Sequence, residues 1–258
     1  MCGRYASSRR PEDLIEEFEV VDARVAAPLE SSYNVAPTDE VYAVVERPPR
    51  SESESTQPEA PQRQLRTVRW GLVPSWAKDV SIGSRMINAR METVAEKPAY
   101  RRAFEKRRCL LPADGYFEWY PTQRTGKNGK PVKQPFFIRP ADRGVLAMAG
   151  LYELWPDPAK EADDPSRWVW SCTVITTEAE DDLGQIHDRM PLMVERDRWA
   201  HWLDPTRPGE LDLLVPAAPG RLEAFPVSTL VSNVRNNGPE LIEPLPAEAA
   251  GEGAETLW

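Results

Sequence analysis

The chain has 258 residues, enough for one large domain with a sizeable core. Its formal net charge of −9 at pH 7 excludes a protein that coats nucleic acid with its whole surface. Nothing at the start resembles a signal peptide and no apolar run reaches the length of a membrane span, so we expect a cytoplasmic protein with no membrane partner.

The first predicted elements are a helix and two strands. Residues 11–20 form an amphipathic pattern, and Pro11 suits the first turn of a helix. Strands are expected at 41–46 and 64–73. Between them, residues 47–63 contain Pro, Ser and Glu and almost nothing apolar, which predicts a flexible insertion within a long hairpin.

The rest of the chain alternates short strands with a few helices. Two more flexible insertions are expected at about 121–134, which contains an Asn-Gly turn, and at 155–167, which is polar. Residues 1–246 are therefore predicted to form a single α+β domain, a largely antiparallel sheet or open barrel with flanking short helices, followed by a disordered tail at 247–258. The other expected elements are a helix at 97–108, strands at 109–120, 135–139, 144–154 and 167–177, and a helix containing Trp199, Trp202 and Leu203.

The cysteine at position 2, in "MCGRYA", is the most unusual feature of the sequence. If Met1 is removed, Cys2 carries a free α-amine and a thiol on adjacent carbons, a pair that no other position in a chain can offer. The other cysteines, Cys109 and Cys172, are distant, and three scattered cysteines predict neither a disulfide framework nor a metal site. No phosphate-binding loop or dinucleotide fingerprint is present, so no cofactor is expected.

Two histidines and one glutamate are candidates for proton transfer. His187 lies in a polar loop beside Asp188 and could transfer protons, or it could be structural, whereas His201 lies between helix-core tryptophans and is expected to be structural. Glu118 lies among aromatic residues on an expected strand. It either points to solvent or occupies a partly dry pocket in which its pKa would rise, and alternation alone does not choose.

Several residues could contact a ligand. Asn88 and Arg90 would place an amide near a reacting group and a guanidinium on a phosphate, although a polar turn without a ligand explains them equally. Trp70 could stack on a base. The cluster of basic residues between Arg85 and Arg108 could form a local basic face, or it could be a solvated helix flank with interleaved glutamates.

Seven blocks of the sequence resemble the SRAP family, the so-called SOS-response-associated peptidases, which shield abasic sites in single-stranded DNA. The resemblance runs from Met1 to about Pro244, and it leaves the polar insertions and the tail unexplained. The blocks, in the order seen in the family, are "MCGRY", "YNVAPT" (33–38), "RWGLVPSW" (69–76), "INARMET" (87–93), "RRCLLPADGYFEW" (107–119), "HDRMP" (187–191) and "VSNVRNNGPEL" (231–241).

The resemblance implies a role in the DNA damage response, with single-stranded or junction DNA containing abasic sites as the partner. After Met1 is removed, by the domain itself or by an aminopeptidase, Cys2 would form a thiazolidine with the aldehyde of the ring-opened sugar. A monomer that joins the nucleoid upon DNA damage is expected. The implied catalytic residues are Cys2, Asn88, Glu118 and His187, and the implied DNA-binding residues are Gly3, Arg4, Trp70, Arg85, Arg90 and Trp119.

Three other functions remain as alternatives. A glutamine amidotransferase with an N-terminal nucleophile would also expose Cys2, but no synthase domain follows it. A single-strand DNA-binding module with an incidental cysteine would bind intact and abasic strands equally. A peptidase acting on other proteins would need a base for Cys2, a role that His187 could fill only through the fold.

Overall fold

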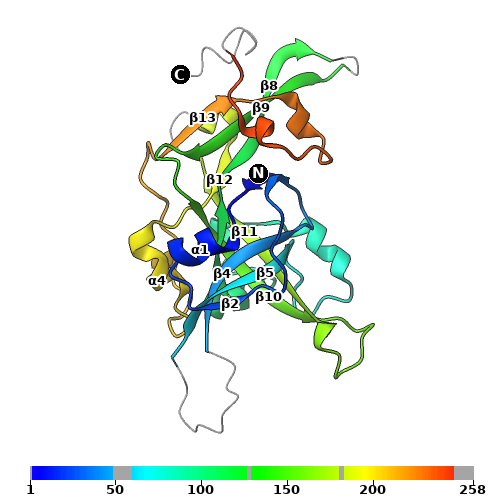
Figure 1. Cartoon of the computed structure of the whole chain (residues 1–258), viewed down its shortest axis with the longest axis vertical. Coiled ribbons are helices and arrows are strands. Elements are labelled where there is room, and N and C mark those ends of the chain that lie inside the picture. Colours follow the sequence, from blue (N-terminus) through cyan, green and yellow to red (C-terminus); the bar gives the residue numbers. More distant parts are fainter. Residues whose placement is uncertain (1, 49–59, 127–128, 180–182, 247–258) are drawn as a thin grey trace.

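The computed structural model describes residues 2–48, 60–126, 129–179 and 183–246. Figure 1 places β8, β9 and β13 toward one end of the long axis and β2, β4, β5 and β10 toward the other, with the N-terminus between them. The strands are β1 (Tyr5–Ser7), β2 (Asp22–Arg24), β3 (Ser32–Val35), β4 (Glu40–Arg47), β5 (Gln62–Trp70), β6 (Asn88–Arg90), β7 (Arg108–Ala113), β8 (Gly115–Thr125), β9 (Pro131–Pro140), β10 (Leu146–Pro156), β11 (Trp168–Glu178), β12 (Arg189–Pro191) and β13 (Leu222–Pro226).

The helices are few and short. The α-helices are α1 (Pro11–Glu17), α2 (Arg101–Lys106), α3 (Leu183–Ile186) and α4 (Trp199–Leu203). The 3₁₀ helices are η1 (Val80–Arg85), η2 (Met91–Thr93), η3 (Pro165–Arg167), η4 (Arg196–Arg198), η5 (Leu211–Leu213), η6 (Thr229–Ser232) and η7 (Pro239–Ile242).

A ring of five strands forms a barrel. β11, β10, β7, β4 and β5 pair in this order, and β5 returns to β11 through a parallel pairing of Ser171 with Arg69 and of Cys172 with Trp70. The α+β prediction is confirmed. However, the barrel is closed rather than open, because a long-range parallel pair joins its two edges.

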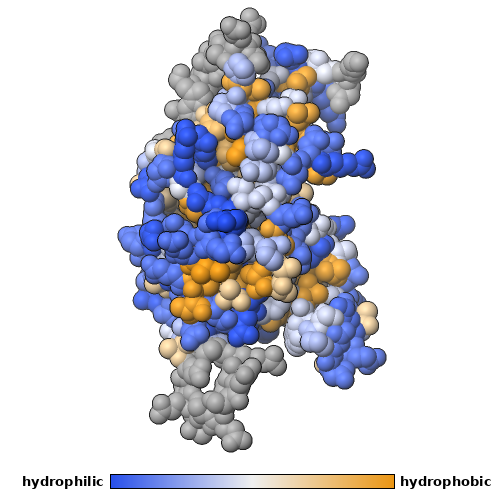
Figure 2. Space-filling model, in the orientation of Figure 1, coloured by the Kyte–Doolittle hydropathy of each residue, from blue (hydrophilic) through white to orange (hydrophobic). Residues whose placement is uncertain are grey.

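Alternation along β4 separates two apolar cores. Val41, Ala43 and Val45 belong to the core that includes Trp70, whereas Tyr42 and Val44 belong to the core that includes α1, α2 and α4. This follows from the two-residue period of a strand, which sends successive side chains to opposite faces. Figure 2 shows hydrophilic residues over most of one face, with a band of hydrophobic residues across its lower half.

The second sheet positions the start of the chain. Its order is β13-β9-β8-β1-β3, so the short strand β1 lies in the interior of the sheet rather than at an edge. Tyr5 pairs with Tyr116 of β8 on one side and with Val35 of β3 on the other. Phe117 also donates its backbone N–H to the carbonyl of Arg4 at 2.9 Å, which extends this pairing toward Cys2. The segment that begins two residues after Cys2 is therefore held by neighbouring strands on both sides.

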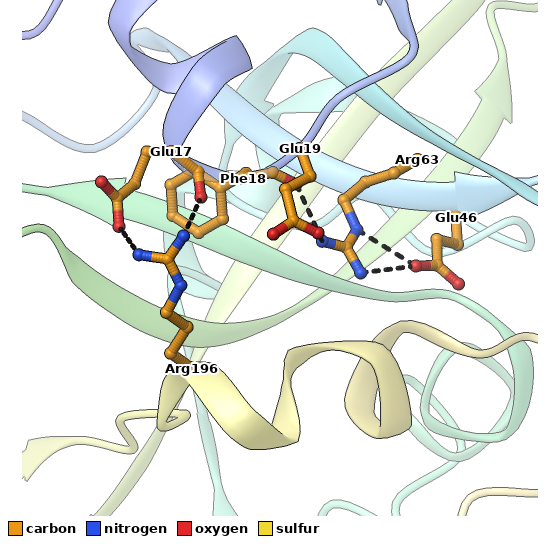
Figure 3. Close-up of polar contacts among 6 residues, drawn as sticks. All are labelled: Glu17, Phe18, Glu19, Glu46, Arg63 and Arg196. Atoms are coloured by element: carbon orange, nitrogen blue, oxygen red, sulfur yellow. Dashed lines mark hydrogen bonds and ion pairs between the residues drawn. The ribbon is translucent and has the colours of Figure 1, made fainter.

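Two arginines hold the end of α1, one from barrel strand β5 and one from η4 (Figure 3). Arg63 of β5 donates to Glu46 Oε1 from both Nε and Nη2 at 3.1 Å and to the carbonyl of Phe18 at 2.8 Å. Arg196 donates to the carboxylate of Glu17 at 3.0 Å from the other side. Because Arg63 is only 14% exposed, its carboxylate and carbonyl partners are needed to compensate its desolvation.

Strands extend into each of the three expected insertions. β8 continues to Thr125 and β9 begins at Pro131, so 121–134 is chiefly a paired hairpin. In 155–167, Lys160 Nζ donates to the backbone and side chain of Ser166 at 2.9 Å, which makes this segment an internally hydrogen-bonded loop. Within 47–63, β5 already begins at Gln62, while 49–59 lies outside the described residues.

Two predicted helices are shorter in the structure than expected. α1 ends at Glu17 rather than at residue 20, and Glu19 has a φ of +53°, which a helix cannot continue. α2 covers only Arg101–Lys106 of the expected 97–108. The predicted disordered tail at 247–258 lies outside the described residues. Within the part of the chain that is described, no helix is long and apolar enough to cross a membrane.

Candidate N-terminal cysteine site

Cys2 lies in a fully buried position, tied to the barrel through Asn88. Asn88 Nδ2 donates a 2.7 Å hydrogen bond to the Cys2 carbonyl. Asn88 begins β6, which pairs in parallel with β11 opposite Val174, and its own carbonyl accepts a bond from Tyr100 Oη at 3.2 Å. The amide is therefore fixed by the barrel wall and in turn fixes the backbone of Cys2.

Glu118 faces the same interior from β8. It is 4% exposed, and burial raises the pKa of its carboxyl to about 7. Burial also raises the pKa of the Cys2 thiol, and the Glu118 carboxylate raises it further, so the two groups are electrostatic neighbours. The sequence allowed two interpretations of Glu118, exposure to solvent or a partly dry pocket, and the structure shows the pocket. At neutral pH this carboxyl group is able both to donate and to accept a proton.

His187 follows α3, which packs against β8. Its Nδ1 accepts the backbone N–H of Arg189 at 3.0 Å, while Asp188 Oδ1 lies 2.9 Å from the same nitrogen. The backbone bond needs a lone pair on Nδ1, whereas a hydrogen bond to the Asp188 carboxylate would need a proton on the same nitrogen, so only one of the two contacts forms at a time. Burial lowers the pKa of His187, which favours the neutral ring with its proton on Nε2.

Asp188 lies close enough to both His187 and Glu118 for its charge to act on each of them. Asp188 raises the pKa of Glu118, although less than burial does. The chain thus brings together a thiol, an amide, a carboxyl group that is half protonated near pH 7, and a neutral imidazole. Among the residues that the structure describes, no cluster of three His, Cys, Asp or Glu side chains is arranged to hold a metal ion.

Arg4 and Trp119 lie beside the site at half-buried positions, as does Gly3 between Cys2 and Arg4. The guanidinium of Arg4 lies 5.7 Å from the centroid of the Trp119 ring. Trp119 Nε1 donates to Ser232 Oγ at 3.0 Å. Burial lowers the pKa of Arg4, while Asp39 acts in the opposite direction. This group of partly exposed cation and aromatic ring is suited to a phosphate and a base.

Asn34 belongs to the "YNVAPT" block, and the sequence alone indicated no function for it. Its Oδ1 accepts a 2.7 Å bond from Arg4 Nη1, and its Nδ2 donates to the carbonyls of Val231, Asn233 and Asn236. It therefore connects the start of the chain to the segment near its end. The only signal in the sequence was that "YNVAPT" and "VSNVRNNGPEL" are both family blocks.

The prediction that Trp70 contacts DNA is wrong. Its side chain is 0% exposed, and its Nε1 donates to the carbonyl of Ile87 at 3.0 Å. The ring packs edge-on against Tyr5 with a centroid distance of 5.1 Å. Trp70 is a core residue that supports the strand leading from Cys2, so it has no free face on which a base could stack.

The basic stretch divides into exposed and structural arginines. Arg108 is buried in β7 and donates to the carbonyls of Phe104, Glu105, Trp202, Asp204 and Arg207, so it belongs to neither a basic face nor a solvated helix flank. Arg107 pairs with Glu153 at 2.8 Å. The exposed members are Arg85, Arg90, Arg101, Arg102 and Lys106.

Arg189 of the "HDRMP" block is a second residue whose function the sequence alone did not indicate. It is buried and forms a two-pronged contact with Glu92, from Nη1 at 2.7 Å and Nη2 at 3.0 Å. It also donates to the carbonyl of Thr176, so it ties β12 to β11 and η2. Its neighbour His187 is thereby held in place through the backbone.

The structure defines a class of protein in which the second residue, a cysteine, is buried against a closed barrel. An amide, a carboxyl group and an imidazole are its neighbours. The family described as SOS response associated peptidase (SRAP) matches residues 1–234. The chain therefore belongs to the SRAP family, which confirms the resemblance seen in the sequence.

Similar proteins cover nearly the whole chain. "Abasic site processing protein YoaM" of Bacillus subtilis is 36% identical over 246 residues, which covers 94% of this chain and 98% of the relative. "Abasic site processing protein YedK" of Escherichia coli is 32% identical, with 95% of this chain and 100% of the relative covered. A crystal structure of a Bacteroides thetaiotaomicron protein shares the fold with a TM-score of 0.74 at 22% identity, covering 95% of this chain and 100% of that one.

Proposed function

We propose that this protein binds single-stranded or junction DNA at abasic sites and crosslinks itself to them through Cys2. The observation that carries the proposal is the placement of Cys2 beside Asn88 and the buried Glu118. Relatives named as abasic site processing proteins support the same substrate. The proposal requires that Met1 be removed, so that Cys2 carries a free α-amine.

The chemistry begins with the amine. An α-amine has an ordinary pKa of about 7.7–8.0, so part of it is neutral near pH 7.5 and can attack the C1′ aldehyde of a ring-opened abasic sugar. The carbinolamine that forms loses its hydroxyl group as water and becomes an imine. Glu118 in its protonated form donates the proton to the leaving hydroxyl, and its pKa near 7 leaves it able to take a proton back.

The thiol completes the bond. Cys2 Sγ adds to the imine carbon, the thiol proton is transferred to the nitrogen, and a five-membered thiazolidine ring results, with one water lost overall. The addition is intramolecular, so it has the rate advantage of reactants held together. The raised pKa of the thiol means that it starts protonated, and the ionised form of Glu118 is the nearby base that can receive this proton.

Other residues hold the substrate. His187, neutral and donating from Nε2, protonates or steadies the sugar oxygen during ring opening. Arg4 and the exposed Arg85 and Arg90 contact phosphates, and Trp119 stacks against a base or sugar. Because one nucleotide must reach a recessed residue, a single strand suits the site better than an intact duplex.

The test is incubation with matched abasic and intact single-stranded oligonucleotides, followed by a denaturing gel and mass spectrometry of the linked peptide. We expect an adduct only with the abasic strand, on a chain that lacks Met1, and none with Cys2→Ala. Cys172→Ala, which removes another buried cysteine, is the matched control and should retain the adduct. An adduct that maps elsewhere, or persists in Cys2→Ala, would contradict the proposal.

The rival reading as a glutamine amidotransferase is tested on the same samples. A thiolate nucleophile needs a lowered pKa, whereas burial raises that of Cys2 here, so we expect no release of ammonia from glutamine. A plain single-strand binding module would bind intact and abasic strands with equal affinity and form no adduct.

A further inference from the structure

A hollow separate from the Cys2 site is lined by residues of β2, β4, β5, β10 and β11. Figure 1 shows β2, β4, β5 and β10 close together in the lower part of the molecule. Its volume is about 730 Å³, within the range of small-molecule sites. No residue assigned above to the Cys2 site lines it. The residues that matter for its chemistry are Arg24, Arg47, Gln64, Arg66, Trp168 and Trp170.

The hollow carries an excess of positive charge. Among the described residues, its three arginines are accompanied by one carboxylate, Asp22, whose Oδ2 accepts from Arg24 Nε at 2.8 Å and from Gln64 Nε2 at 3.1 Å. Arg66 donates to the neutral Gln64 Oε1 from Nε and Nη2, at 2.9 and 2.7 Å. Arg47 has no carboxylate partner among the described residues. Burial lowers the pKa of Arg66 and the nearby charge of Arg47 lowers it further, which shows that these cations repel each other.

Aromatic rings form the rest of the lining. Trp170 stacks on Tyr152 with a centroid distance of 5.4 Å and an interplanar angle of 14°. The guanidiniums of Arg66 and Arg47 lie 4.2 and 5.0 Å from the Trp170 centroid. Trp168 is 51% exposed, and within the described part of the chain no ring or cation stacks on it. One indole thus orients the cations, and the other presents a free flat surface.

Stacking between arginine and tryptophan accounts for the place of Arg66 and Arg47, but it does not neutralise them. Three guanidiniums around a hollow to which the described residues contribute a single carboxylate are suited to a doubly charged phosphate, since the planar fork of arginine matches phosphate oxygens. The exposed indole of Trp168 is suited to a π-face of any nucleobase. The two features together select a ligand that has both a phosphate and a flat ring.

We propose that this hollow binds a nucleotide, either free in solution or as one unit of a nucleic acid strand, at a site separate from Cys2. The phosphate contacts Arg24 and Arg47, and the base packs on Trp168. This goes beyond the proposed crosslinking activity and does not depend on it, because no atom of Cys2, Asn88 or Glu118 takes part.

The experiment titrates the full chain with dAMP, deoxyadenosine, inorganic phosphate and an intact oligodeoxyadenylate by isothermal titration calorimetry. The pocket variants are Arg47→Gln and Trp168→Ala. The matched controls are Arg10→Gln, an exposed arginine, and Trp76→Ala, a similarly exposed tryptophan, neither of which lines the hollow. Circular dichroism and melting temperature establish that each variant is folded.

We expect dAMP to bind at a single site, with each pocket variant at least about tenfold weaker and each control within about twofold. Deoxyadenosine and phosphate should each bind at least about tenfold more weakly than dAMP, because each lacks one of the two contacts. If the oligonucleotide binds more tightly than dAMP and loses affinity in the same variants, the source is a strand; if it does not compete with dAMP, the source is a free nucleotide.

Three results would overturn the assignment. These are no saturable binding of dAMP or of the oligonucleotide at millimolar concentration, pocket variants that bind as tightly as their controls, and phosphate binding equal to that of dAMP. None of these bears on the Cys2 adduct, which is measured separately on a denaturing gel.

Discussion

Asn88 Nδ2 and the carbonyl oxygen of Cys2 form a 2.7 Å hydrogen bond across 86 residues of sequence. The bond fixes the backbone of the second residue against a strand of the barrel, so the thiol and the nitrogen of Cys2 are held at a defined place. Asn88 Oδ1 is buried without a hydrogen-bond partner among the described residues. Because buried acceptors are normally paired, this oxygen is available to a donor on the substrate.

The substitution Asn88→Asp keeps the shape of the side chain and removes the donor to Cys2. We expect adduct formation with saturating abasic oligonucleotide to slow by about tenfold or more, since the reactive residue loses its positioning contact. Single-turnover gels measure the rate. Gln62→Glu makes the same amide-to-carboxylate change at an exposed position, and as the control it should react like the wild type. A wild-type rate in Asn88→Asp would show that the bond does not position Cys2.

The pH dependence of the reaction should report Glu118. Its pKa is raised by burial to about 7, so the proton-donating form is lost as the pH rises through 7, while the α-amine becomes neutral toward pH 8. The rate of adduct formation should therefore pass through a maximum between these values. In Glu118→Gln the rate should be lower and should rise with pH without a falling limb. A falling limb that persists in this variant would assign it to another group.

Glu118 should also reduce the stability of the fold. A carboxyl group with a folded pKa above its unfolded value favours folding below about pH 4.5, and this contribution is lost as the pH rises through about 7. Glu118→Gln should thus raise the free energy of unfolding at pH 8 by up to roughly 3 kcal/mol and change it little at pH 4. Urea unfolding at the two pH values measures this, and an equal effect at both would contradict the linkage.

Trp70 and Trp119 should separate stability from DNA binding. Trp70→Ala removes a fully buried ring and should cost about 3–5 kcal/mol of unfolding free energy. Trp119→Ala should cost less, because its ring is only half buried, but it should weaken binding to an intact single strand. Urea unfolding and fluorescence anisotropy of a labelled oligonucleotide measure the two effects. Unchanged DNA affinity in Trp119→Ala would exclude it from the interface.

Local sequence patterns predicted what depends on local chemistry. A cysteine directly after the initiator can be recognised as a special position from its place alone, and the alternation in β4 follows from the pleat. Glu118 could be identified as a candidate, but not as buried, because its burial depends on the pairing of β8 with β9 and on the packing of α3. The closing pair of β5 and β11 joins segments about a hundred residues apart, so no local pattern announces it.

Two misassigned residues show how long-range packing overrides residue type. Trp70 lies two positions after Val68, on the same inward face of β5, and the period of the strand would have placed it in the core. Arg108 reads as the end of a basic helix, yet it opens a buried strand. Its guanidinium is compensated by the carbonyls of Trp202, Asp204 and Arg207, which lie far ahead in the chain and give no signal near residue 108.

The interior position of β1 affects how the protein folds during translation. Cys2 leaves the ribosome before almost every other residue, yet Tyr5 has no partner on one side until Tyr116 of β8 has been made. The first part of the chain to be synthesised thus cannot complete its pairing until nearly half of the chain has been made. For nearly half of translation the nascent chain therefore carries Cys2 without Glu118, and the two groups become neighbours only as the second sheet assembles.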